Sequence, residues 1–172
     1  MLNKSDIAVM PEYFDRYINL VEDENLLTAF ENSINFLENL DVQKLTQLKD
    51  KTYEAEKWTI NKIVQHITDI ERLLTAGVLR FARGENFHII SFNEDEMAKN
   101  SKANHKNISK IISELVSVRT STFELFKTFD SEDLQKVGIN WKYEISVLAM
   151  GFNIVGHQIH HFNIIKERYW SL

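Results

Sequence analysis

The chain has 172 residues, 44% of them hydrophobic and 26% charged, which is enough to bury a core within a single domain spanning residues 1–172. The net charge of −5 provides no basic surface for nucleic acid, and no apolar run of about 18 residues predicts a membrane span. Residues 1–10 lack the apolar segment of a secretory signal. Zero cysteines exclude disulfides, thiolate nucleophiles and cysteine-bound zinc. We therefore expect a cytoplasmic protein.

Hydrophobic periodicity predicts four long helices. The single proline and the five glycines leave few interruptions, and apolar residues recur every three or four positions in four segments. These segments are 23–40, 59–83, 103–129 and 146–169. The predicted fold is an all-α four-helix bundle. The last segment is apolar on more than one face, so it should have neighbours on most sides, one of which could be a partner subunit.

Long connections separate the predicted helices, at residues 41–58, 85–102 and 130–145. Loops longer than about 12–15 residues are uncommon in compact domains and often carry function. We expect the connection over 85–102 to contain a short extra helix near 94–100, which would cover one end of the bundle.

Two histidines in the last predicted helix, His157 and His161, are four residues apart. This spacing places them on one helix face, together with Met150 and Ile154, so both rings should point inward. A buried neutral imidazole needs a partner for each ring nitrogen, and a metal ion would satisfy one nitrogen on each ring. Two hydrogen-bonded core histidines would give the same pattern.

His66, in the second predicted helix, strengthens the metal interpretation. Alone it would be read as a core or boundary residue. Three histidines from two facing helices, however, form a set that leaves coordination positions open for water or substrate. His160 is rotated by about 100° from its neighbour, so we expect it at an interface or the surface. His88 and His105 are expected to be solvated.

Polar residues near these histidines have several possible roles. Asp69 is three residues after the first histidine and could act as a base, bind a ligand imidazole or occupy a coordination site. A surface salt bridge explains it equally well, and it is the expected role of Glu71. Asn153 is one turn before His157 on the same face and Gln158 is one residue past it, and either could orient a ligand or contact substrate. Ordinary hydrogen bonding is the simpler interpretation of both.

Five stretches, in order along nearly the whole chain, carry a specific combination of motifs. They are MPEYFDRYINLVEDENLL at 10–27, KWTINKIVQHITDIER at 57–72, LRFARGE at 79–85, SFNEDEMAKNS at 91–101 and GHQIHHFNIIKERY at 156–169. In these motifs the chain resembles the DinB superfamily, which includes proteins described as metal-dependent hydrolases and bacillithiol transferases. The family's ligand pattern falls on His66, His157 and His161. Gly77 departs from the pattern, because a large or charged residue is expected there.

The resemblance implies an up-down-down-up bundle, a homodimer, and one divalent ion, zinc or nickel, at one end. Some relatives join low-molecular-weight thiols to electrophiles, and others isomerise maleylpyruvate with a thiol cofactor. The resulting hypothesis is a metalloenzyme that acts on a small-molecule substrate after activating a thiol cosubstrate or water, with Asp69 as a possible base. The alternative is a non-catalytic stress-response module with a structural metal or a sequestered ligand.

Overall fold

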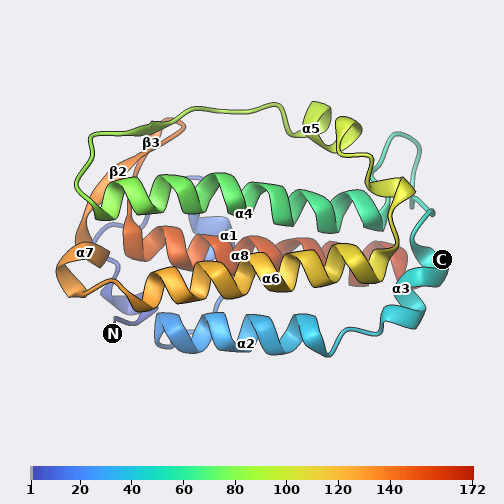
Figure 1. Cartoon of the computed structure of the whole chain (residues 1–172), viewed down its shortest axis with the longest axis horizontal. Helices are drawn as coiled ribbons and strands as arrows, with labels where there is room; N and C mark the ends of the chain where they lie inside the picture. Colours follow the sequence, from blue (N-terminus) through green and yellow to red (C-terminus); the bar gives the residue numbers. More distant parts are fainter. Residues whose placement is uncertain (1) are drawn as a thin grey trace.

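The computed structural model describes residues 2–172 and contains four long helices. They are α2 (Leu26–Glu38), α4 (Ile60–Ala82), α6 (Ile108–Lys127) and α8 (Val147–Ile164). The helices α4 and α6 run parallel to each other and opposite to α2 and α8, which gives the up-down-down-up order (Figure 1). Each long helix packs on two others, in the cyclic order α2, α6, α4, α8. The predicted four-helix bundle is confirmed.

Side-chain caps fix where these helices begin. Asn25, Thr59, Asn107 and Ser146 each accept a hydrogen bond from a backbone N–H group in the first turn that follows. Such caps satisfy donors that have no partner within the helix. The predicted caps at Thr59 and Ser146 are confirmed. The predicted start of the third helix at residue 103 is wrong, because a separate 3₁₀ turn, η2 (Ala103–His105), precedes the Asn107 cap.

The connection between α4 and α6 crosses the length of the bundle, because two parallel neighbouring helices need a connection that returns to the starting end (Figure 1). This crossover carries a two-residue strand, β1 (His88–Ile89), and a short helix, α5 (Glu94–Asn100), capped by Asn93. The predicted extra helix near 94–100 is confirmed. In Figure 1 the crossover runs along the length of α4, above it in this view.

A small three-stranded sheet was not predicted. The strands β2 (Val137–Asn140) and β3 (Tyr143–Ser146) form an antiparallel hairpin, and β1 pairs with β2 in parallel. The sheet fastens the crossover to one end of the bundle. It also accounts for Gly77, because a Cβ at this position of α4 would lie 2.2 Å from Cδ1 of Ile89 in β1.

The remaining elements are short: η1 (Lys4–Asp6), α1 (Asp15–Ile18), α3 (Val42–Leu48), α7 (Ser131–Gln135) and the π-helical turn η3 (Ile165–Tyr169). The helix α1 lies against α8. This close contact requires Gly156, since a Cβ there would be 2.0 Å from the carbonyl oxygen of Tyr17. Among the described helices, none is both long and apolar enough to cross a membrane.

An ion pair is buried inside the bundle. Arg119 of α6 is 0% exposed and Glu71 of α4 is 2% exposed. The Arg119 Nε and Nη2 atoms each donate to a Glu71 oxygen at 2.9 Å, and Nη1 donates to the Ser33 hydroxyl at 2.6 Å. The expectation of a surface salt bridge for Glu71 is therefore wrong. Partners for every group of this pair offset the cost of removing two charges from water.

Candidate metal centre

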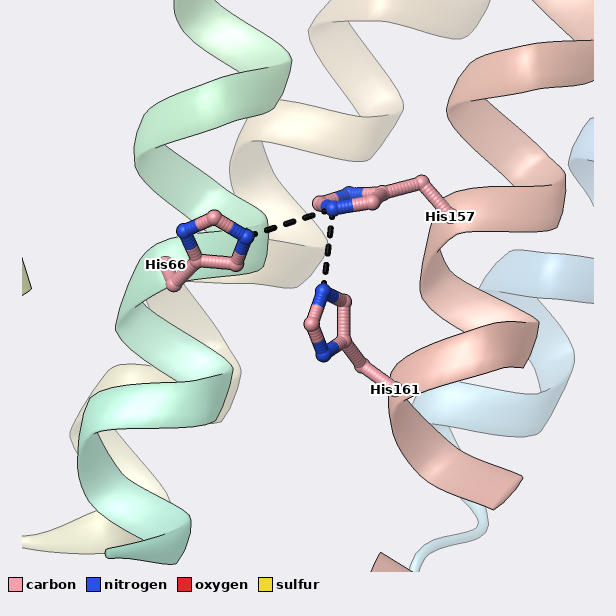
Figure 2. Close-up of side chains that lie close together, drawn as sticks. All are labelled: His66, His157 and His161. Atoms are coloured by element: carbon pink, nitrogen blue, oxygen red, sulfur yellow. Dashed lines mark hydrogen bonds between the residues drawn. The ribbon is translucent and has the colours of Figure 1, made fainter. Parts of the chain in front are cut away.

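Three histidine side chains converge between α4 and α8 (Figure 2). His66 projects from α4, and His157 and His161 project from successive turns of α8. The Nε2 atom of His157 lies 3.2 Å from that of His66 and 3.0 Å from that of His161. The three potential ligand atoms all lie within 4.8 Å of one another. The structure therefore brings the three predicted ligands together.

This arrangement fits a metal ion. Zinc–nitrogen bonds of about 2.0–2.1 Å, at angles of about 90–110°, place ligand nitrogens roughly 2.9–3.4 Å apart. Both Nε2 distances to His157 lie in that range. A ring nitrogen carries either one proton or one lone pair, so the Nε2 of His157 cannot form two good hydrogen bonds to the other rings. A cation placed between the three rings would accept a lone pair from one nitrogen of each ring.

Burial keeps the three rings neutral near neutral pH. Burial lowers the pKa of His66 from 6.5 to about 4, although the negative charge of Asp95 raises it in part. Burial and the neighbouring His66 lower the pKa of His161 to about 2. Burial is also the main reason that the pKa of His157 is well below its usual value. Neutral imidazoles are the form that binds a metal.

Residues that the sequence did not single out surround His66. The Trp58 ring packs on the His66 ring with centroids 4.8 Å apart, and its Nε1 donates to Asp95 at 3.1 Å. The hydroxyl of Tyr169, in η3, donates to the backbone oxygen of Trp58. Asp95 belongs to α5, so this helix of the crossover places a negative charge near His66. The acidic stretch at 91–101 was a signal for this carboxylate.

Asp69 lies apart from this cluster. Its carboxylate accepts a hydrogen bond from Gln65 at 2.9 Å and pairs with Arg72 at 3.4 Å. Arg72 in turn pairs with Glu114 of α6. Within residues 2–172, the group of potential metal ligands contains the three histidines and no carboxylate. A role for Asp69 as a base stays a prediction, and its contacts are those of the alternative interpretation, a salt bridge.

The two predicted amides of α8 lie on different sides of the helix. Asn153 lines a cavity of about 300 Å³ together with His157, whereas Gln158 faces α2 and donates to the Ser33 carbonyl at 3.3 Å. Asn153 is 2% exposed and Gln158 is 1% exposed. The side-chain oxygens of both lack a hydrogen-bond partner. His160 is half-buried, with its ring 5.1 Å from that of Tyr17.

A four-helix bundle with three converging histidines on two facing helices defines the class of this protein. A family model described as the DinB superfamily matches residues 25–165, and the chain belongs to this superfamily. A search of curated proteins finds no match. The fold is similar to that of YfiT from Bacillus subtilis, described as a probable metal-dependent hydrolase with an unusual four-helix bundle topology. The identity is 17%, the TM-score is 0.65, and the likeness covers 91% of this chain and 85% of that one.

Proposed function

We propose that this chain is a metalloenzyme. His66, His157 and His161 hold one divalent ion, zinc or nickel, and the site directs a nucleophile, either water or a low-molecular-weight thiol, at an electrophilic small molecule. The convergence of three buried imidazole nitrogens supports this proposal. A bound divalent ion lowers the pKa of a water or thiol attached to it and so supplies a nucleophile near neutral pH.

The residues of the chain hold and shield this site. Neutral imidazoles present lone pairs without competition from protons, and Trp58 and Tyr17 cover the edges of the cluster with their rings. Since the chain contains no cysteine, a thiol would have to enter as a cosubstrate. YfiT is described as a probable metal-dependent hydrolase, which favours water as the nucleophile for that protein. The thiol-joining relatives that the superfamily resemblance implies favour a thiol.

The contacts of Asp69 bear on the non-catalytic alternative. A structural zinc site normally has four protein ligands, whereas a catalytic site keeps a position open. Asp69 was the candidate for a fourth ligand, and its carboxylate contacts Gln65 and Arg72 instead. This supports an open site over a closed structural one.

The first experiment measures metal content in untagged protein after exposure to zinc or nickel and removal of excess ion. We expect close to one equivalent per chain in the wild type. The variant His161→Ala should bind at least about tenfold more weakly, because even outer-shell changes cost that much. The control His105→Ala changes an exposed histidine and should match the wild type. Equal metal in wild type and His161→Ala would contradict the proposal.

The second experiment asks whether the loaded protein is catalytic. A panel of esters and amides tests hydrolysis, and a generic electrophile with several low-molecular-weight thiols tests thiol transfer. We expect turnover on one panel that rises with bound metal and is lost in His161→Ala. Full metal occupancy without turnover on either panel would favour the non-catalytic module.

A further inference from the structure

The cavity of about 300 Å³ beside His157 is built from five parts of the chain. The segment around α1, the helix α4, the crossover, the turn of the β2–β3 hairpin and α8 each contribute to its wall. Its lining residues are Tyr13, Phe14, Tyr17, Ile70, Leu74, Ile90, Ser91, Phe92, Glu94, Asn140, Trp141, Asn153 and His157. This volume is at the lower end of the range for small-molecule sites.

Two buried carboxamides line this cavity without strong partners. Asn153 is 2% exposed, and its side-chain oxygen has no hydrogen bond within the protein. Asn140 is 5% exposed, and its side-chain nitrogen reaches only the sulfur of Met150, at 3.6 Å. An unsatisfied buried polar group costs about 1–3 kcal/mol, so such groups are normally paired. A ligand that both donates and accepts would pair them.

Charge is confined to the mouth of the cavity. Glu94 is the one carboxylate in the lining, and it is an exposed residue of α5. Although the residue is exposed, the protein around its carboxyl partly removes it from water, which raises the pKa of Glu94, and the positive charge of Arg16 acts in the opposite direction. The Arg16 guanidinium lies 3.8 Å from the centre of the Tyr13 ring and donates to the Tyr17 hydroxyl at 2.9 Å. The two opposite charges at the mouth offset each other, and the inner wall is uncharged.

Two aromatic side chains in the wall are held in an uncommon backbone conformation. Tyr13 has a φ of 68° and Trp141 has a φ of 57°, and their ring centroids are 5.1 Å apart. Left-handed backbone is unfavourable for bulky residues, and it persists where surrounding structure enforces it, often at ligand sites. The surrounding structure therefore holds the backbone from which both rings project.

We infer that this cavity binds a small molecule with a flat, apolar body and an uncharged head that both donates and accepts hydrogen bonds, such as a carboxamide. The body lies against Tyr13 and Trp141, and the head pairs with Asn153 and Asn140 beside His157. The identification of this small molecule as a substrate rests on the proposed function, because the cavity adjoins the proposed metal site. The binding of the small molecule to the cavity does not depend on a metal ion.

The test compares three single-ring probes that differ in the head group: benzamide is neutral and both donates and accepts, benzoate is negative and only accepts, and benzylammonium is positive and only donates. Calorimetry or ligand-observed nuclear magnetic resonance gives their affinities for the wild-type chain, with and without bound metal. We expect metal-free protein to bind benzamide at least about tenfold more tightly than either charged probe, which corresponds to about one well-placed hydrogen bond. Equal binding of the three probes, or tighter binding of either charged one, would overturn the inference.

Variants test the role of the amides. Asn153→Leu keeps a similar volume and should lose about tenfold in benzamide affinity, and Asn140→Leu should show a loss in the same direction. Asn163→Leu alters an exposed amide of the same helix and serves as the control. If either buried variant fails to fold, the wild-type probe comparison still decides. His161 does not line the cavity, so His161→Ala should lose metal yet retain benzamide preference, which separates failure of this inference from failure of the metal proposal.

Discussion

At the scale of single residues, the histidines and the carboxylates differed in how well the sequence located them. Helical geometry places residues four apart on one face, so His157 and His161 could be paired from spacing alone. The partners of Glu71 and Asp69 depend on which helix lies alongside, and spacing within one helix carries no such information. Asp95 was missed as a neighbour of the cluster for the same reason, since it lies 37 positions after Trp58, with the whole of α4 between them.

Acid should destabilise the metal-free protein through these histidines. His66 has a pKa near 6.5 when unfolded and about 4 when folded, so the unfolded state binds more protons between these values. The free energy of unfolding should therefore fall as the pH drops from about 6.5 towards 4, by up to about 3 kcal/mol from His66 alone. Urea unfolding at several pH values measures this. His66→Gln should flatten the dependence, and an unchanged slope would contradict the assignment.

Breaking the buried ion pair should be costly. Arg119→Met leaves the Glu71 carboxylate buried without its main partner, and we expect a loss of about 3–5 kcal/mol in the free energy of unfolding. Adding Glu71→Gln to that variant should recover part of the loss. The control Arg72→Met removes the partly exposed ion pairs with Asp69 and Glu114 and should cost about 1 kcal/mol or less. Similar losses for the two single variants would contradict this account.

At the scale of elements, the long helices follow from their hydrophobic period, whereas the sheet does not. Strands of two and four residues are too short to show an alternating pattern, and β1 is defined only by its pairing with β2. The hairpin nevertheless supplies Trp141 and Asn140 to the cavity wall. The part of the site that depends on long-range pairing is therefore the part that the sequence did not predict.

The contact between α1 and α8 should tolerate no side chain at Gly156. A Cβ there would meet the Tyr17 backbone, which cannot move without displacing α1, and overpacking of this kind costs about 1–3 kcal/mol. Gly151→Ala is the comparison in the same helix, because its Cβ would meet side-chain atoms alone, the end of Leu26 at 2.8 Å and the Phe126 ring at 2.9 Å, rather than backbone. Chemical unfolding should show the larger loss for Gly156→Ala. The reverse order would refute this explanation.

At the scale of the whole molecule, the core consists of two hydrophobic clusters that share helices. The helix α4 contributes Ile60, Ile63 and Ile67 to one cluster and Leu74 and Phe81 to the other, and α6 and α8 also pass through both. Shared helices couple the two clusters mechanically. This coupling supports the prediction that the chain is a single domain.

Unfolding should accordingly occur in one transition. Circular dichroism reports the helices, and tryptophan fluorescence reports all three tryptophans: Trp58 near one cluster, Trp170 beside Lys44 of α3, and Trp141 in the β2–β3 hairpin. The two signals should change at the same denaturant concentration if the chain unfolds as one unit. Two separated transitions would indicate two independently stable parts.

The homodimer stays a prediction from the superfamily resemblance. Sedimentation equilibrium at micromolar concentration should give about twice the chain mass of 20.2 kDa. A clean monomer at that concentration would remove the dimer without affecting the metal site, since all three histidines lie in one chain.

The π-helical turn η3 has a consequence for genetic truncation. It follows α8 directly, and its Tyr169 hydroxyl donates to the backbone oxygen of Trp58, whose ring packs on His66. The final turn of the chain thus braces the start of α4 from outside the cluster of three histidines. A frameshift or stop codon near residue 165 would leave every histidine of the cluster encoded and yet loosen the wall that holds the first of them. Truncations that end after the codon of His161 should therefore still cause loss of function.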